Sequence, residues 1–203
     1  MKKPHRRLSE IWHWPVLTVL FLMLLQSCNV SSLLVKVNTA YDQNARFETY
    51  KTYNWYQPNP AAAAQSIQPY TDNLHNHIRK AIEQELNKKG LQKTSANPDL
   101  LVAYDVSIPH QARRPVSQPL PADFGYSYAW LMGYRYDYSH TAIPNYQPVS
   151  TYKPNTIIVD LIDANTRELV WRGWVEEVVE DYNATYKTVE NYVDDIIDTY
   201  PPR

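Results

Sequence analysis

Two adjacent segments in the last quarter of the sequence constrain the fold most. Residues 156–162 are apolar on both alternating faces except at Asp160, a pattern typical of a central strand. Asp163-Ala164-Asn165-Thr166 has the composition of a turn, and residues 168–175 follow as a second strand. These segments predict a hairpin at the centre of a sheet, with Asp160 bonded to a neighbour such as Arg172 across it.

Other segments extend this hairpin into a layered domain. Residues 33–39, 49–56 and 99–108 have the alternation or β-branched content of strands. Residues 72–89 and 186–199 carry apolar side chains at helical spacing, and the first helix is expected to end at Gly90. We predict an α+β fold, in which two helices pack on one face of a small, mostly antiparallel sheet.

The predicted strands are interrupted by a long irregular loop, residues 109–154, which contains seven of the fifteen prolines and seven of the seventeen tyrosines. Tyrosine offers rigid, amphipathic contact area at a low entropic cost, which suits recognition of a protein or a glycan. A possible recognition surface is formed by Tyr126, Tyr128, Trp130, Tyr134, Tyr136 and Tyr138. The alternative is a loop that only covers the sheet or is disordered.

Trp171 and Trp174 lie an odd number of residues apart in the predicted second strand of the hairpin. Side chains alternate between the two faces of a strand, so these two face opposite sides. We expect one of them to pack under a helix and the other to be covered by the long loop.

The N-terminal segment has the features of a secretory signal. Lys2, Lys3, Arg6 and Arg7 precede the apolar run 16–25, which is too short to span a membrane. The run ends at Leu25-Gln26-Ser27-Cys28, which resembles the lipobox of bacterial lipoproteins. This resemblance implies lipidation of Cys28 and cleavage before it; the alternatives are an ordinary secretory signal with an incidental cysteine, or an N-terminal anchor.

These features predict the organisation and location of the chain. Residues 1–27 form the signal peptide, residues 28–32 the lipidated cysteine and a tether, and residues 33–203 a single domain. Asn29 follows Cys28 without an acidic cluster, so we expect the periplasmic face of the outer membrane, with the membrane as a partner through the lipid anchor. Cleavage leaves 16 basic against 20 acidic residues, which excludes a basic nucleic-acid surface.

The sequence also resembles a family of bacterial lipoproteins known as "domain of unknown function 4136". The segments that carry the resemblance are Tyr41-Asp42, Phe47–Trp55, Asn97–Val102, Ile157–Asp163, Leu169–Trp174 and Tyr200-Pro201-Pro202. The resemblance implies an α+β fold of two helices against a small sheet in an envelope lipoprotein. It implies no activity.

We find no set of residues that indicates an enzyme. His75 and His77 are two residues apart on a helix and point about 200° apart, so they cannot share a metal. His110 and His140 fall in the long loop. Asp160 and Asp163 could form an acid–base pair, but the ion pair and the turn explain them better. No cofactor and no metal are expected.

The sequence therefore predicts a lipid-anchored protein of the bacterial cell envelope with a binding or structural role. Its expected partner is an envelope protein or a glycan. The alternative is a glycan- or peptidoglycan-binding module that uses the loop aromatics, and a periplasmic hydrolase is less favoured.

Overall fold

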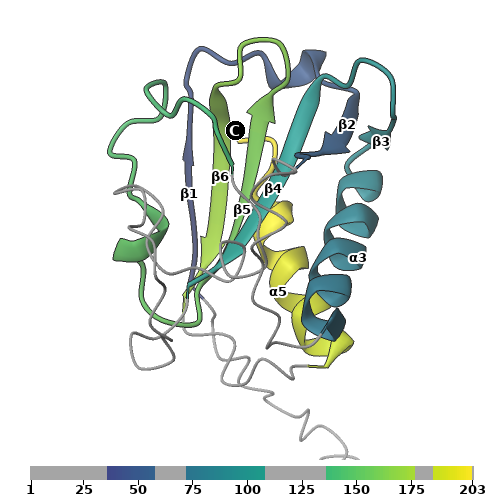
Figure 1. The fold of residues 1–203 in the computed structure, drawn as a ribbon, viewed down its shortest axis with the longest axis vertical. Coiled ribbons are helices and arrows are strands. Elements are labelled where there is room, and N and C mark those ends of the chain that lie inside the picture. Colours follow the sequence, from purple (N-terminus) through teal and green to yellow (C-terminus); the bar gives the residue numbers. More distant parts are fainter. Residues whose placement is uncertain (1–35, 58–71, 108–135, 177–184, 203) are drawn as a thin grey trace, which may run out of the picture. The chain divides into compact units, whose positions relative to one another are not determined.

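A computed structural model describes residues 36–57, 72–107, 136–176 and 185–202. The chain divides into two units, residues 1–34 and 35–203, and all the described residues belong to the second. Its elements, in chain order, are β1 (Val37–Tyr41), η1 (Phe47–Thr49), β2 (Thr52–Trp55), α3 (Asp72–Lys88), β3 (Gln92–Lys93), β4 (Leu100–Val106), η3 (Val149–Thr151), β5 (Ile157–Asp163), β6 (Leu169–Val175) and α5 (Tyr186–Asp198) (Figure 1). Within these residues, neither helix has the length and apolarity needed to cross a bilayer.

The six strands form one sheet in the order β1-β6-β5-β4-β2-β3. The strands from β1 through β6 and β5 to β4 pair antiparallel with one another, whereas β2 runs parallel to both β4 and β3. The predicted α+β architecture is therefore confirmed. Three details differ from the prediction. The first described strand begins at Val37, and residues 33–35 of the strand predicted there lie outside the described residues. The strand predicted over residues 49–56 is shorter, because Thr49 ends the 3-10 helix η1 and β2 begins at Thr52, and β3 with its parallel pairing has no counterpart in the prediction.

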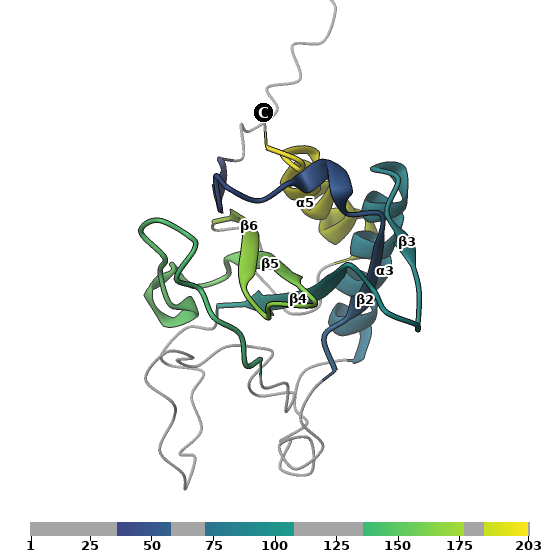
Figure 2. The ribbon, with the colours of Figure 1, turned by 90° about the horizontal axis from the view of Figure 1, so that it is seen from above.

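Both helices pack on the same face of the sheet (Figure 2). The alternation predicted in β4 is confirmed, because alternate residues of this strand, beginning at Leu100, point into the helix-side core. The helices contribute fully buried aliphatic side chains, namely Leu74, Ile78, Ile82, Leu86, Val189, Val193, Ile196 and Ile197. Each such side chain stabilises the fold by about 1.5–3 kcal/mol.

The opposite face of the sheet is covered by the segment 136–156 (Figure 2). The two tryptophans of β6 lie on opposite faces of the sheet, one in the helix-side core and the other under the segment 136–156. The Trp171 ring lies 5.7 Å from that of Tyr200 in the helix-side core, and the Trp174 ring lies 5.3 Å from that of Tyr152 under the segment. The prediction that they face opposite sides, one under a helix and one under the loop, is confirmed.

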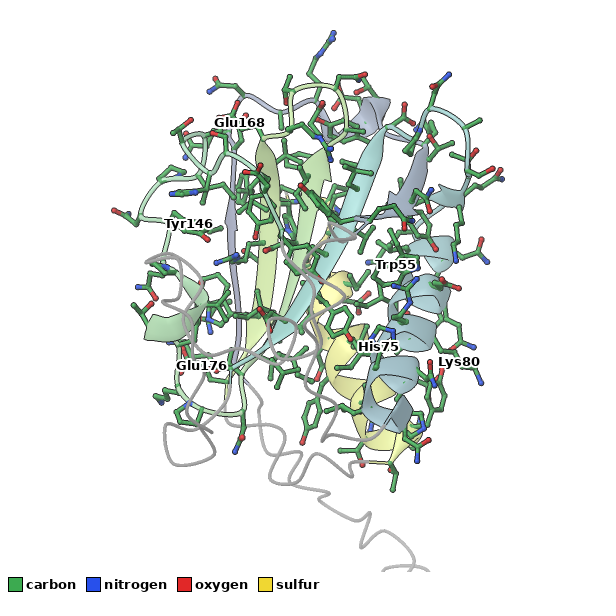
Figure 3. The ribbon with its side chains drawn as sticks, in the orientation of Figure 1. Trp55, His75, Lys80, Tyr146, Glu168 and Glu176 are labelled. Atoms are coloured by element: carbon green, nitrogen blue, oxygen red, sulfur yellow. The ribbon has the colours of Figure 1, made fainter. Side chains whose placement is uncertain are left out.

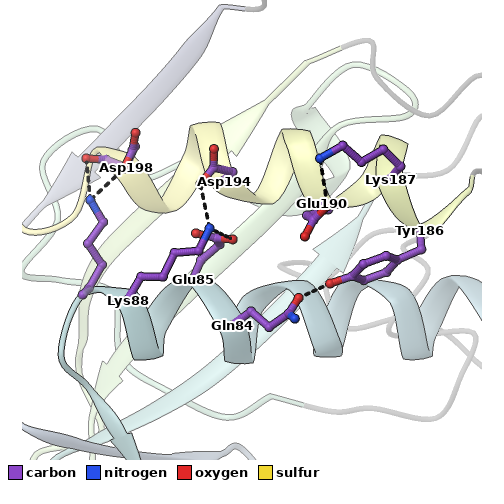
Figure 4. A network of polar contacts seen from close by, with 9 residues as sticks. Gln84, Glu85, Lys88, Tyr186, Lys187, Glu190, Asp194 and Asp198 are labelled. Atoms are coloured by element: carbon purple, nitrogen blue, oxygen red, sulfur yellow. Dashed lines mark hydrogen bonds and ion pairs between the residues drawn. The ribbon is translucent and has the colours of Figure 1, made fainter.

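A row of polar contacts joins the two helices along their outer surface (Figure 4). Lys88 donates to Glu85 at 2.8 Å and lies 3.7 Å from Asp194 of α5, and Lys89 donates to Asp198 at 2.9 Å. Glu85 is only 2% exposed. Burial raises the pKa of Glu85, and the Asp194 carboxyl adds to this effect while Lys88 opposes it.

Gly173 of β6 sits where the sheet meets α5, and we predict that Gly173→Ala destabilises the fold. A Cβ atom at this position would lie 2.5 Å from the Trp171 ring and 2.7 Å from the Ile196 side chain, so both would have to move. The expected loss in the free energy of unfolding, measured by urea titration, is about 1–3 kcal/mol. The exposed Asn87→Ala on α3 is the control and should cause no such loss; equal stability of Gly173→Ala and the wild type would contradict this packing.

The helix interface should show a distinctive pH dependence. The raised pKa of Glu85 means that the folded state favours its protonated form, so its contribution to stability is present at low pH and is lost as the pH rises through the folded-state pKa. We predict that the stability of the wild type relative to Glu85→Gln increases as the pH falls from about 7 to about 4. Chemical denaturation at each pH gives this difference.

Glu83 provides a control of opposite sign on the same helix. Burial alone would raise its pKa, but hydrogen bonds from Lys93 at 2.5 Å and Trp55 at 2.6 Å outweigh burial and lower it. Acidification should therefore reduce the stability of the wild type relative to Glu83→Gln. The same sign for both variants would contradict the assignment for Glu85.

Candidate functional site

A buried ion pair lies at the centre of the β5–β6 hairpin. The sheet register places Asp160 directly opposite Arg172. The guanidinium Nε donates to Asp160 Oδ1 at 2.6 Å and Nη2 donates to Oδ2 at 2.7 Å, while Asp160 and Arg172 are only 4% and 1% exposed. The cross-hairpin partner predicted for Asp160 is therefore confirmed, and the contact is a bidentate one.

The covering segment completes the hydrogen bonds of this pair. Nη1 of Arg172 donates to the carbonyl of Gln147 at 2.8 Å, and Nη2 donates to the hydroxyl of Tyr138 at 3.2 Å. The same hydroxyl donates to Asp160 Oδ2 at 2.5 Å. The segment 136–156 is thus docked on a charge pair that the sheet supplies.

Aromatic rings enclose the guanidinium from the segment side. The Arg172 carbon Cζ lies 4.7 Å from the ring centre of Tyr146 and 5.8 Å from that of Tyr152. His140 stacks on Tyr146 with ring centres 3.8 Å apart. Cation–π attraction over these faces favours the charged form of the buried guanidinium.

The electrostatics of the cluster hold its groups in fixed charge states. Burial would lower the pKa of Arg172, but the carboxylate of Asp160 outweighs burial and holds this pKa well above its usual value. Burial and the charge of Asp160 raise the pKa of Tyr138 well above its usual value. Arg172 therefore stays charged and Tyr138 neutral near pH 7, which suits a structural cluster rather than proton transfer.

Tyr136 and Tyr138, two of the six residues predicted as a recognition surface, face the sheet. Tyr136 is 8% exposed, and its hydroxyl donates to the carbonyl of Tyr104 at 3.0 Å. Its ring packs edge-on against Tyr56, whose hydroxyl donates to the carbonyl of Asp137 at 2.5 Å. Tyr126, Tyr128, Trp130 and Tyr134 lie outside the described residues, as does Cys28, and their roles stay predictions.

A second group of residues gathers at the end of the sheet where β1 leads into η1. A cleft of about 450 Å³ is lined by Tyr41, Asp42, Gln43, Ala45, Phe47, Glu48, Pro201 and Pro202. Beside it, a cleft of about 400 Å³ is lined by Asn44, Ala45, Arg46, Thr49, Tyr50, Asp99, Asp163 and Asn165. Several of the segments that carry the resemblance described above therefore line the two clefts, among them Tyr41-Asp42, the start of Phe47–Trp55 and Pro201-Pro202.

The carboxylates of the second cleft fix the local backbone. Asp99 accepts from the amides of Lys51 and Thr52 at 2.9 and 2.8 Å, and these bonds lower its pKa. Asp163 accepts from the hydroxyl of Tyr50 at 3.0 Å and from the amide of Asn165 at 2.8 Å. The turn role predicted for Asp163 is confirmed, and Asp160 and Asp163 do not share a cleft.

The histidines of the described residues take part in ring contacts. A ring nitrogen of His75 lies 2.5 Å from the hydroxyl of Tyr104, and the ring of His77 lies 5.6 Å from that of Tyr186. Figure 3 shows His75 and Trp55 beside α3, apart from Tyr146. Within the described part of the chain, no three His, Cys, Asp or Glu side chains gather as a metal site would require, and His110 lies outside it.

Sequence reasoning missed the aromatic and backbone partners of Arg172. Tyr146, Tyr152 and the carbonyl of Gln147 come from irregular backbone, so no period in the sequence indicates that they converge on one side chain. The available signal was Arg172 itself, a charged residue within the apolar Leu169–Val175 strand. A charge at a buried strand position requires several partners.

Comparison with protein families decides the family of this chain. The model of the family described as "Domain of unknown function (DUF4136)" matches residues 37–202. The chain belongs to the DUF4136 family. The match includes both helices and all six strands, so the DUF4136 domain is the folded unit described above.

One solved structure of a family member has the same fold at low sequence identity. A DUF4136 family protein from Bacteroides thetaiotaomicron is 16% identical with a TM-score of 0.50, and the match covers 82% of this chain and 96% of that one. A PDZ domain protein from Parabacteroides distasonis is 19% identical with a TM-score of 0.47; the match covers 83% of this chain but only 36% of that longer one.

A third similar structure is the PelC dodecamer from Paraburkholderia phytofirmans. It is 9% identical with a TM-score of 0.42, and the match covers 83% of this chain and 99% of that one. No curated protein matches the sequence.

The role of Arg172 in docking the covering segment gives a direct prediction. Arg172→Met leaves Asp160 buried without its partner, so we expect the free energy of unfolding to fall by about 3–5 kcal/mol. The double variant Arg172→Met with Asp160→Leu removes both charges and should recover most of that loss. Urea titration of the single and double variants measures the coupling between the two sites; additive losses would contradict the assignment.

Proposed function

We propose that this protein is a lipid-anchored component of the bacterial cell envelope, held on the periplasmic face of the outer membrane, whose DUF4136 domain acts by binding or structural association. The observation that carries the proposal is the sequence Leu25-Gln26-Ser27-Cys28, which ends the N-terminal apolar run and contains the only cysteine of the chain. A diacylated or triacylated cysteine holds a protein stably, because two chains suffice where one is marginal.

The sequence separation between Cys28 and the domain is compatible with this assignment. Strand β1 begins at Val37, so eight residues of chain, 29–36, separate Cys28 from the sheet. Eight residues span at most roughly 26–29 Å, which keeps the domain close to the bilayer surface. The membrane itself is then the first partner of the protein.

The chemistry of the described residues favours binding over catalysis. Asp160, Arg172 and Tyr138 satisfy one another inside the domain, and Asp99 and Asp163 hold backbone amides. Clefts of about 450 and 400 Å³ at the β1–η1 end are open to a partner. We assign the partner to the envelope, as another protein or a glycan; glycan recognition would draw on Tyr126, Tyr128, Trp130 and Tyr134.

Metabolic labelling with an alkyne fatty acid tests the anchor. The wild type should be labelled and recovered in the outer-membrane fraction, and Cys28→Ser should lose both the label and the membrane association. The double variant Cys28→Ser with Ser32→Cys is the matched control, because it keeps one thiol four residues downstream and should also be unlabelled. An unlabelled, soluble wild type, or a label that persists in Cys28→Ser, would overturn the proposal.

A further inference from the structure

Strand β1 forms one edge of the sheet and has an open side. It is the outermost strand on its side of the sheet and pairs with β6 (Figure 1). Among the described residues, no hydrogen bond joins its outer side to another strand. All five residues of β1 remain partly exposed, whereas β4, β5 and β6 are almost wholly buried. The cleft that Tyr41 and Asp42 line adjoins one end of this edge.

The hydrogen-bond pattern shows which backbone groups face outward. The amide of Asp42 donates to the carbonyl of Val170 at 3.0 Å, so Asp42 faces β6. Backbone groups alternate in direction along an antiparallel strand, and Ala40 and Asn38 therefore also face β6. The amide and carbonyl groups of Val37, Thr39 and Tyr41 point away from the sheet.

The two edges of the sheet differ in how they resist pairing. The opposite edge, β3, consists of only Gln92 and Lys93, both exposed, and a short edge with a lysine discourages strand addition. Strand β1 has five residues, without a charged side chain or a proline among them. Its own five residues therefore lack two features, charged side chains and proline, that natural edge strands use to avoid pairing.

We propose that two copies of this chain pair antiparallel through β1, with Thr39 on the two-fold axis. In this register Val37 of one copy lies opposite Tyr41 of the other, and Thr39 lies opposite its own counterpart. The backbone groups of Val37, Thr39 and Tyr41 in one copy then face the outward-pointing groups of Tyr41, Thr39 and Val37 in the other. Each of these three facing pairs can form backbone hydrogen bonds across the interface. An interface of this kind is isologous, since the same surface serves both subunits.

Charge selects this register. Lys36 precedes β1 and Asp42 follows it, so antiparallel pairing about Thr39 places Lys36 of each copy opposite Asp42 of the other. Lys36 is exposed and forms no ion pair among the described residues, and one oxygen of Asp42 accepts from the amide of Asn44 at 2.8 Å, which leaves its second oxygen available. Opposite charges facing each other across strands are favourable, and the two-fold axis makes this contact twice.

The pairing is compatible with attachment of both copies to one membrane, a point that rests on the proposed lipid anchor. The two Val37 residues would be offset by about 14 Å, the length of a five-residue strand. Tethers of eight residues reach roughly 26–29 Å, so both anchors can enter the same bilayer.

Cysteine cross-linking in the full chain tests the pairing. Thr39→Cys places the two new thiols opposite each other across the axis, where the Cα atoms are about 5.5 Å apart. A short bis-maleimide should convert Thr39→Cys to a covalent dimer at least ten times more efficiently than Lys51→Cys, an exposed control position. Adding Lys36→Glu should reduce this yield several-fold, because it places a carboxylate at position 36 of each copy opposite Asp42 of the other, whereas adding Lys51→Glu should not.

Equal cross-linking of Thr39→Cys and Lys51→Cys, or none at Thr39, would overturn the proposal. Sedimentation of the purified wild type gives an independent test that needs no variant: a dimer is expected, and a monomer at all concentrations up to about 100 μM would contradict the pairing. Cross-linking of the wild type itself would show that Cys28 has a free thiol, and this result would contradict the proposed lipid anchor. The pairing through β1 would then be judged by the Thr39→Cys result alone.

Discussion

The buried pair of Arg172 and Asp160 is the interaction on which the two-faced architecture depends. Two charges removed from water cost several kcal/mol each unless hydrogen bonds replace their hydration. The sheet supplies only one partner for each, and the carbonyl of Gln147 and the hydroxyl of Tyr138 supply the others. The sheet and the irregular segment 136–156 therefore stabilise each other, and the helices cover only one of the two faces.

Much of this fold could be predicted because its strongest signals are local. The alternation in Leu100–Val106, the apolar run around Asp160 and the two amphipathic helices each follow from the period of one segment. The parallel pairing of β2 with β4 and β3 could not, because it is a long-range register set by packing, and a two-residue strand has no period. Residues 33–35, which the prediction included in the first strand, lie outside the described residues.

In the candidate site, only the contact between two paired strands could be predicted from the sequence. The pairing of Asp160 with Arg172 follows from a hairpin with a short turn, whereas Tyr146 and Gln147 come from backbone without a repeating pattern. Tyrosine composition indicated contact area in the loop, and in the described part that area is used on the sheet by Tyr136 and Tyr138. Within the described part of the chain, the β1 edge and the clefts beside it are open surfaces, and we propose them for association with a second copy and with envelope partners.

Hydrogen–deuterium exchange of the wild-type domain tests most directly whether the segment 136–156 belongs to the folded core. The amide of Ser139 donates to the carbonyl of Arg167 at 2.9 Å, and that of Asn155 donates to the carbonyl of Ser107 at 2.7 Å. If the Arg172 cluster holds the segment on the sheet, these amides will exchange as slowly as those of β5 and β6, in one cooperative unit. Exchange of the segment at the rate of an unstructured peptide, with β5 and β6 still protected, would contradict this architecture.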